Sequence, residues 1–138
     1  MSNKNIRLLA LSSGGGHWVQ LLRVRPAFVN CEVIFATSKI GYRANIGAEA
    51  QFRLIPDANR WNKIGLLRVV FAIFLLIWRE RPEVVISTGA APGYFAVRIG
   101  NLFGARTIWV DSIANSEELS LSGRKVGPYA SLLSLIHI

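Results

Sequence analysis

The sequence predicts one α/β domain in which helices cover both faces of a mostly parallel sheet. Short runs rich in β-branched and aromatic residues alternate along the chain with longer helical segments, which is typical of such sheets. The chain has 138 residues, of which 51% are hydrophobic and 17% charged. This length fits a single domain, and this composition excludes intrinsic disorder.

The first half of the chain predicts a strand, a glycine turn, a helix and two more strands. Residues 6–12 are mostly apolar and stop at a glycine run, and the apolar spacing over residues 19–24 is helical. Residues 31–37 are β-branched and aromatic, and residues 51–56 alternate polar and apolar side chains before a proline. Residues 39–47 hold two glycines without periodicity, so a long loop and a degraded crossover helix both stay open.

A long apolar helix dominates the second half. Residues 63–81 are expected to be helical up to Pro82, because a residue before proline is pushed out of the α region. Residues 83–88 have the composition of a buried strand, and small residues then lead into a helix that we expect to end at Gly104. Residues 106–112 supply another strand.

The charge balance indicates an anionic partner. Sixteen Lys and Arg against eight Asp and Glu give a net charge of +8, which favours an anionic membrane surface or a phosphate-bearing ligand. Nucleic acid is disfavoured, because the basic residues are scattered singly without an aromatic-basic motif. Cys31 is the only cysteine, so we expect a thiol in a reducing, cytoplasmic compartment. The apolar run over residues 6–11 is too short for a signal peptide.

Three glycines follow the first expected strand: Gly14, Gly15 and Gly16. At such a turn the backbone can approach a ligand, and the next helix offers N–H groups to a phosphate. The dinucleotide fingerprint would need a glycine where Trp18 or Val19 stands, and the second strand does not end in an acidic residue. NAD is therefore disfavoured, and neither a cofactor nor a metal is expected. A tight turn without a ligand is the alternative.

His17 stands at the first turn of the following helix. The helix dipole favours its neutral form there, which leaves one ring nitrogen free to accept a proton. This arrangement suits a general base, and a purely structural histidine is the alternative.

A second small-residue turn ends the fourth expected strand and consists of Gly89, Ala90, Ala91, Pro92 and Gly93. The next strand ends in Asp111 and Ser112, and Glu117 follows. Because the carboxyl ends of parallel strands form the ligand crevice of an open sheet, both turns can face one ligand. Asp111 is the second candidate catalytic residue and is expected to orient an acceptor hydroxyl. Close packing of the turn on the sheet, and a capping role for Asp111, are the alternatives.

Residues 69–78 are apolar around the whole helix, although a crossover helix should keep a polar outer face. The stretch is too short to span a bilayer, which takes roughly 20 apolar residues, so we expect it to lie in the membrane interface. Basic and tryptophan side chains suit contact with anionic headgroups. The expected membrane contacts are Trp61, Arg68, Phe71, Phe74, Leu75, Trp78 and Arg79. Burial against a partner subunit is the alternative.

Three stretches, residues 12–18, 82–93 and 109–123, resemble a known enzyme family. The first reads Ser-Ser-Gly-Gly-Gly-His-Trp, the second contains Ser-Thr-Gly-Ala-Ala-Pro-Gly, and the third begins Trp-Val-Asp-Ser. They resemble the membrane-associated subunit of the split glycosyltransferase of asparagine-linked glycosylation, and look closer still to its bacterial relatives in exopolysaccharide and capsule assembly. The resemblance covers nearly the whole chain to Gly127.

The resemblance implies half of a GT-B enzyme at the cytoplasmic face of the plasma membrane. This half would be a Rossmann-like domain, equivalent to the N-terminal domain, that binds a polyprenyl-diphosphate-linked sugar. A partner polypeptide would hold the UDP-sugar, such as UDP-GlcNAc or UDP-glucuronic acid. The enzyme that makes lipid II has a similar glycine loop ending in His. By that similarity His17 is the base or a diphosphate contact, residues 14–16 are the diphosphate loop, and residues 89–93 and 111–123 line the cleft.

The chain departs from the family in two places. Its last residues, 128–138, do not match the sequence with which family members continue, so we expect the domain to be truncated or altered after about residue 127. The N-terminal membrane span of the eukaryotic subunit is absent, so anchoring would fall to residues 63–81. Two other functions stay open: a non-catalytic scaffold that recruits the partner transferase to the membrane, and a soluble nucleotide-binding protein.

Overall fold

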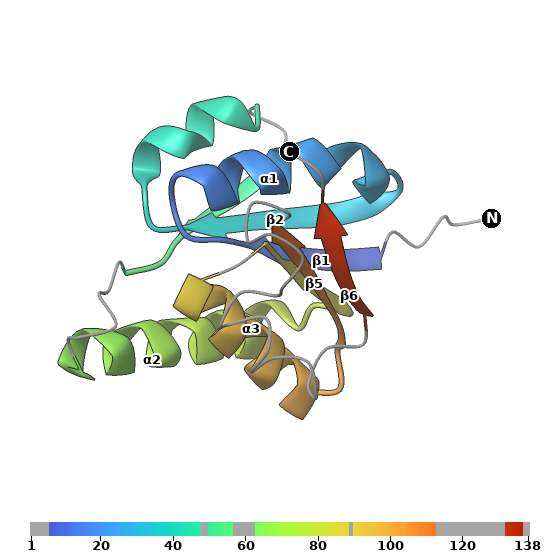
Figure 1. The fold of residues 1–138 in the computed structure, drawn as a ribbon. Helices are drawn as coiled ribbons and strands as arrows, with labels where there is room; N and C mark the ends of the chain where they lie inside the picture. Colours follow the sequence, from blue (N-terminus) through green and yellow to red (C-terminus); the bar gives the residue numbers. More distant parts are fainter. Residues whose placement is uncertain (1–5, 48–49, 57–62, 89, 113–131, 137–138) are drawn as a thin grey trace.

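A computed structural model describes residues 6–47, 50–56, 63–88, 90–112 and 132–136 (Figure 1). The strands are β1 (Ile6–Leu11), β2 (Cys31–Thr37), β3 (Gln51–Leu54), β4 (Val84–Ser87), β5 (Arg106–Ser112) and β6 (Leu132–Ile136). The helices are α1 (Gly16–Val24), α2 (Lys63–Glu80) and α3 (Ala90–Leu102), with two short 3-10 helices, η1 (Arg25–Phe28) and η2 (Ile40–Asn45). All pairings in the sheet are parallel, in the order β3-β2-β1-β4-β5-β6. The predicted fold class is confirmed.

Helices cover both faces of the sheet (Figure 1): α1 lies on one face, and α2 and α3 lie on the other. The central strand β1 is buried on both sides, which explains its nearly continuous apolar sequence. Leu8 and Ala10 pack in one cluster with Trp18 of α1. Leu9 packs in the opposite cluster with Ile73 of α2. Alternation along β1 therefore divides the core into two layers.

Helix α3 approaches the sheet more closely than a side chain on its inner face would allow. A Cβ on Gly93 would collide with Ser87 Oγ, and a Cβ on Gly100 would lie 2.9 Å from Val85 Cγ2. The helix stops before Gly104, whose φ of +81° is the left-handed conformation of a glycine C-cap. The predicted end of this helix is confirmed.

The end of α2 is fixed to the sheet by one carboxylate. Glu80 accepts a hydrogen bond from Arg7 Nη2 at 2.8 Å and another from Arg53 Nε at 3.2 Å. Arg7 belongs to β1 and Arg53 to β3, so this carboxylate spans from the central strand to the edge strand. It holds the last turn of α2 at the amino ends of the strands.

Two segments differ from expectation or go beyond it. Residues 39–47, which the sequence leaves between a loop and a helix, contain the short η2. The strand β6 is not predicted from the sequence, although it lies in the tail that we expect to be altered. Its Leu-Leu-Ser-Leu-Ile sequence pairs with β5 from Ile108 to Ser112, which extends the sheet by one strand.

Candidate functional site

The candidate site lies where the strand order reverses. The chain runs from β1 outward to β2 and β3, and from β4 outward in the other direction to β5. Open α/β sheets bind ligands in the crevice outside the carboxyl ends of the strands at such a point. Leu11 at the end of β1 pairs with Ser87 at the end of β4. The two small-residue turns therefore leave the sheet side by side, as the sequence predicts.

Each of the three loop glycines has a different environment. Gly15 has a φ of +71°, which L side chains rarely adopt. A Cβ on Gly14 would lie 3.2 Å from Lys39 Cε and 3.4 Å from Tyr42 Oη. A Cβ on Gly16 would meet no atom within 4 Å. Backbone conformation thus accounts for one glycine and packing for another, while nothing within the described structure requires the third.

The imidazole of His17 is held by the turn after β4. Its Nδ1 lies 3.0 Å from the carbonyl oxygen of Thr88, and the Thr88 hydroxyl donates a hydrogen bond to the carbonyl oxygen of His17. Because a carbonyl only accepts, Nδ1 carries the proton, and Nε2 of the neutral ring keeps its lone pair. The half-buried imidazole is thus oriented, with one nitrogen available to accept a proton.

Two side chains that sequence reasoning missed reach the glycine loop from the segment after β2. The N–H of Gly15 donates to Tyr42 Oη at 2.9 Å, and the side chain of Lys39 lies against Gly14. The Tyr42 ring stacks on Trp18 of α1 at 5.1 Å between centroids. Only the position of these residues in the sequence could have indicated their role. They follow the carboxyl end of β2, which neighbours β1 in the sheet, and ligands bind at this edge of open α/β sheets.

The second turn favours packing over ligand contact at one predicted site residue. Pro92 and Gly93 are both buried, and a Cβ on Gly93 would meet Ser87 and Trp109. Gly93 is therefore explained by the close approach of α3 to the sheet. Pro92 is the third residue of α3, where its missing N–H breaks no helical hydrogen bond.

The remaining predicted site residues are placed by their elements. Ala90 is the first residue of α3, and Asp111 and Ser112 end β5 at the same edge of the sheet as the two turns. Gly89 and Glu117 lie outside the described residues, as does Trp61 of the expected membrane contacts.

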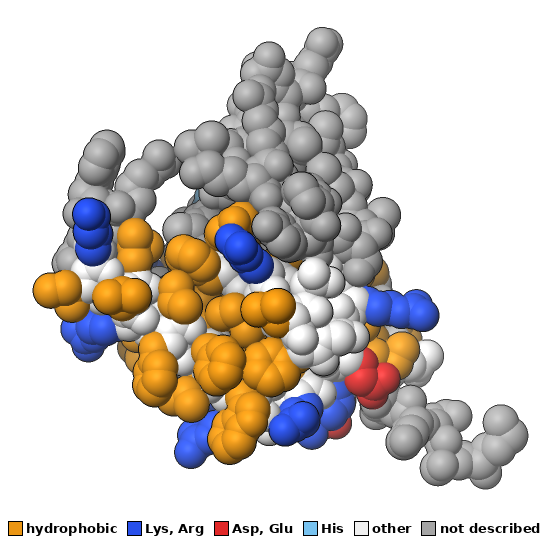
Figure 2. All heavy atoms as spheres, turned by 90° about the horizontal axis from the view of Figure 1, so that it is seen from below, with side chains coloured by type: hydrophobic (Ala, Val, Ile, Leu, Met, Phe, Trp, Pro, Cys, Tyr) orange, Lys and Arg blue, Asp and Glu red, His pale blue; other side chains and the backbone are white. Residues whose placement is uncertain are grey.

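The outer face of α2 is an exposed apolar stripe (Figure 2). The buried stripe of the helix is Val69, Ile73, Leu76 and Ile77. The exposed stripe, which with Leu102 and Phe103 we call the α2 surface, is Ile64, Leu67, Phe71, Phe74, Leu75 and Trp78. Phe103 extends it because its ring lies 5.4 Å from that of Phe74. Exposed Arg68 and Arg79 belong to the same helix. Among the described residues, no helix is long and apolar enough to cross a membrane.

The sequence predicts an all-round apolar helix but misses the part that α3 contributes. Leu102 is 79% exposed and Phe103 39% exposed, so the end of α3 adds apolar area beside α2. The sequence feature that could have predicted this area is the Leu-Phe pair directly before Gly104. It ends the helix that packs beside α2 in the structure.

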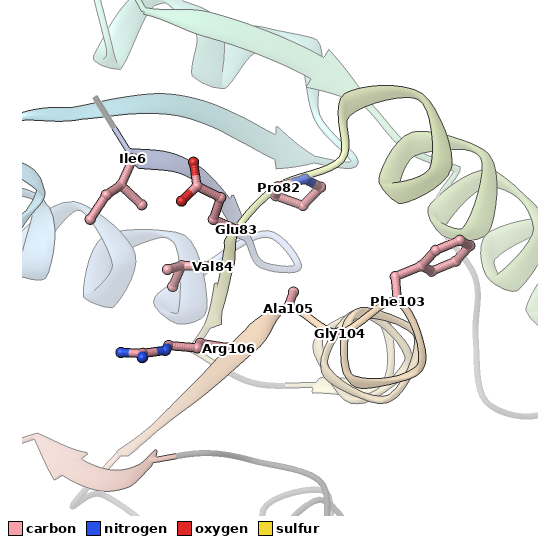
Figure 3. A pocket seen from close by; sticks show the side chains of 8 residues that line it. All are labelled: Ile6, Pro82, Glu83, Val84, Phe103, Gly104, Ala105 and Arg106. Atoms are coloured by element: carbon pink, nitrogen blue, oxygen red, sulfur yellow. The ribbon is translucent and has the colours of Figure 1, made fainter. Parts of the chain in front are cut away.

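A pocket of about 450 Å³ lies at the opposite edge of the sheet (Figure 3). It is lined by Ile6, Pro82, Glu83, Val84, Phe103, Gly104, Ala105 and Arg106, which stand at the beginnings of β1, β4 and β5. The glycine loop and His17 lie at the other ends of the strands, so this pocket is separate from the candidate site.

Comparison with solved structures identifies related folds. MurG from Acinetobacter baumannii matches with a TM-score of 0.71 and 11% identity, over 94% of this chain and 41% of that one. A UDP-GlcNAc 2-epimerase from Methanocaldococcus jannaschii matches with 0.67 and 12%, over 93% and 38%. A further UDP-N-acetylglucosamine 2-epimerase matches with 0.71 and 11%, over 94% and 41%.

The chain spans about two fifths of the length of these proteins. No protein-family model and no curated protein sequence matches it. These three structures have the fold of GT-B glycosyltransferase-like proteins, and the chain has the fold of their N-terminal domain.

Proposed function

We propose that this chain is the acceptor-binding half of a GT-B glycosyltransferase. It would act with a donor-binding partner to transfer a sugar from a UDP-sugar to a polyprenyl-diphosphate-linked acceptor. The observation that carries this proposal is His17, which is held through Nδ1 beside a glycine loop at the reversal point of the sheet and whose Nε2 has no hydrogen-bond partner among the described residues. The names of the matching epimerases contain a UDP-sugar, which supports this donor class.

The proposed reaction needs a proton acceptor at the hydroxyl of the acceptor sugar. As that oxygen bonds to the anomeric carbon of the donor, its proton passes to His17 Nε2 and the UDP group leaves with the electrons of the broken bond. Backbone N–H groups at the start of α1 would bind the acceptor diphosphate, because a helix N-terminus favours anions. Asp111, at the end of β5, would orient the hydroxyl.

The α2 surface supports a membrane location for this reaction. A lipid-linked acceptor stays in the bilayer, so the enzyme must work at its surface. Exposed apolar side chains on α2, with Arg68 and Arg79 on the same helix, have the composition of an interfacial helix that binds anionic headgroups. We infer peripheral attachment at the cytoplasmic face of the plasma membrane.

Replacement of His17 tests the proposal. In the complex with the donor-binding partner, His17→Ala should lower turnover by about 10²–10⁴-fold, the usual contribution of a general base. His17→Gln keeps a group that can donate to the Thr88 carbonyl but removes the proton acceptor, so it should be as slow as the alanine variant. Assembly with the partner and liposome binding should be unchanged in both.

A second candidate function is a non-catalytic scaffold that brings the partner to its lipid substrate. The α2 surface favours it, because membrane recruitment needs that surface and not the imidazole. Turnover that survives both His17 variants and a change at Asp111 would establish the scaffold. A glutamine variant near the wild-type rate, with a slow alanine variant, would make His17 an acceptor ligand and not the base.

A further inference from the structure

We propose that Lys39 and Tyr42 complete the diphosphate site at the glycine loop. Lys39 would bind the diphosphate. In the absence of ligand, the Tyr42 hydroxyl would accept the hydrogen bond from the loop that a phosphate oxygen accepts in the complex. The proposal rests on the proposed function, since it names side chains outside the glycine loop for the same acceptor. Neither residue belongs to the stretches that resemble the enzyme family.

The geometry places both side chains at the mouth of the loop. Lys39 Cε and Cδ lie 3.2 and 3.4 Å from the position of a Cβ on Gly14, so the ammonium group at the end of the chain is beside the loop. Tyr42 Oη accepts the N–H of Gly15 at 2.9 Å. That N–H belongs to the N-cap of α1, which is where an anion would accept it.

The position of Tyr42 is built by several contacts. Its ring lies parallel to that of Trp18, with 8° between the planes, and Trp18 Nε1 donates to Asn45 Oδ1 at 3.3 Å. Arg25 donates to the carbonyl oxygen of Ile46 at 2.7 Å. The ring is thereby held on α1, and the C-terminal end of η2 is held by Trp18 and Arg25, so the hydroxyl is presented to the loop by a fixed ring.

Two buried hydroxyl groups lie where the glycine loop and the segment with Lys39 and Tyr42 leave the sheet. Ser12 precedes the glycine loop and Thr37 ends β2, and each is fully buried. Within the described structure neither hydroxyl has a hydrogen-bond partner. By strand alternation with Ala10 and Phe35, their side chains belong to the face of the sheet that α1 covers. Buried hydroxyls normally have partners, and these two lie where the chain leaves the sheet toward the glycine loop and toward Lys39.

The charges also point to an anion. The positively charged side chain of Lys39 lies beside the N-terminus of α1, which carries the positive end of the helix dipole. No ion pair among the described residues includes Lys39. Glu80, in the last turn of α2, is engaged by two arginines, and Glu83 directly precedes β4 at the amino ends of the strands. An anionic ligand would neutralise the positive charge of Lys39, which no salt bridge between described residues does.

Calorimetric titration of the full chain tests the inference, with inorganic pyrophosphate, farnesyl diphosphate and UDP as probes. Lys39→Met keeps the aliphatic stem and should weaken binding of pyrophosphate and farnesyl diphosphate by about 10- to 100-fold, as for loss of a charged hydrogen bond. Lys39→Arg should stay within about threefold of wild type. Arg23→Met, an equal loss of charge at the far end of α1, is the control and should bind as wild type.

Tyr42→Phe keeps the ring stack on Trp18 and removes only the hydroxyl. Because the ligand no longer competes for the Gly15 N–H, it should bind about three- to tenfold more tightly. If Tyr42→Phe binds farnesyl diphosphate more weakly than the wild type, or if Lys39→Met binds it equally well, the inference is overturned. The proposed acceptor site would still be supported in that case, provided that the wild-type chain binds farnesyl diphosphate. UDP binding that exceeds farnesyl diphosphate and depends on Lys39 overturns both, and so does a wild-type chain that binds none of the probes.

Discussion

The glycine loop shows why neighbouring residues of one type need separate explanations. At Gly15 the backbone has a positive φ, at Gly14 two side chains from another segment come within van der Waals distance, and at Gly16 there is open space. A substitution therefore tests a different property at each position: the conformation of the turn, the approach of Lys39 and Tyr42, or the approach of a ligand.

Alanine substitutions should separate folding from binding at this loop. Gly15→Ala should lower the free energy of unfolding by about 1–3 kcal/mol, because its φ and ψ are strained for a residue with a Cβ. Gly16→Ala should leave stability within about 0.5 kcal/mol but weaken farnesyl diphosphate binding at least about tenfold, because its Cβ would occupy the ligand's space. Denaturant titration and calorimetry measure the two quantities. Full binding by Gly16→Ala would show that no diphosphate approaches this loop.

Residue types and their order predict only part of the site. His17 is placed at the first turn of its helix by the glycines before it, so its position can be predicted. Its contact with Thr88 depends on β4 lying next to β1, a pairing of segments about seventy residues apart that no local pattern specifies. Lys39 and Tyr42 were missed for the same reason, since their role depends on how η2 folds over α1.

Helix α2 combines two apolar stripes with different roles. One stripe packs on the sheet, and the opposite stripe is exposed along the whole length of the helix. Because the composition is apolar on both sides, the sequence predicts the helix and its unusual outer face. It does not show which side chains belong to which stripe until the sheet fixes the rotation of the helix, and the addition from α3 appears only when both helices are packed.

Three substitutions on the exposed stripe should abolish membrane binding. Leu67, Phe71 and Trp78 are each at least half exposed, so their replacement by Ser should leave the fold intact. Each substitution removes roughly 1.5–3 kcal/mol of favourable free energy from burial of an apolar side chain in the membrane. The fraction of protein that sediments with anionic liposomes should therefore fall to background. Serine at Val19, Val29 and Ile40, which are exposed on other elements, is the matched control. Sedimentation of the α2 variant at the control level would assign this surface to a protein partner.

The strands and helices are predicted well where each element has its own pattern. The spans of β2 and β5 agree with the expected residues 31–37 and 106–112, and α2 differs from the expected helix by one residue. The strand β6 is missed because no pattern in the sequence before its short apolar run predicts a further strand. Its position beside β5 is seen only in the folded sheet.

The properties of the whole molecule suit the acceptor side of the reaction that we propose. Its candidate anion site, its net charge of +8 and its α2 surface all suit an anionic, membrane-bound acceptor, and its length is about two fifths of the proteins that share its fold. In the proposed function, the donor binds outside these 138 residues.

The isolated chain should accordingly have no transferase activity and no measurable affinity for a UDP-sugar. Adding the donor-binding partner should restore both turnover and UDP-sugar binding, because the partner supplies the second half of the cleft. Calorimetric titration of the chain with UDP-GlcNAc and UDP-glucuronic acid, alone and in the complex, checks this. Tight binding to the chain alone would place the donor site here and contradict the division of labour.

The double link between His17 and Thr88 has a consequence for engineering. Each of the two residues donates to the carbonyl oxygen of the other, so the first turn of α1 and the end of β4 are one mechanical unit. A designer who grafts a foreign segment after β4 therefore also changes the support of the His17 imidazole. The two turns are not interchangeable modules, because a change in one alters the geometry of the other.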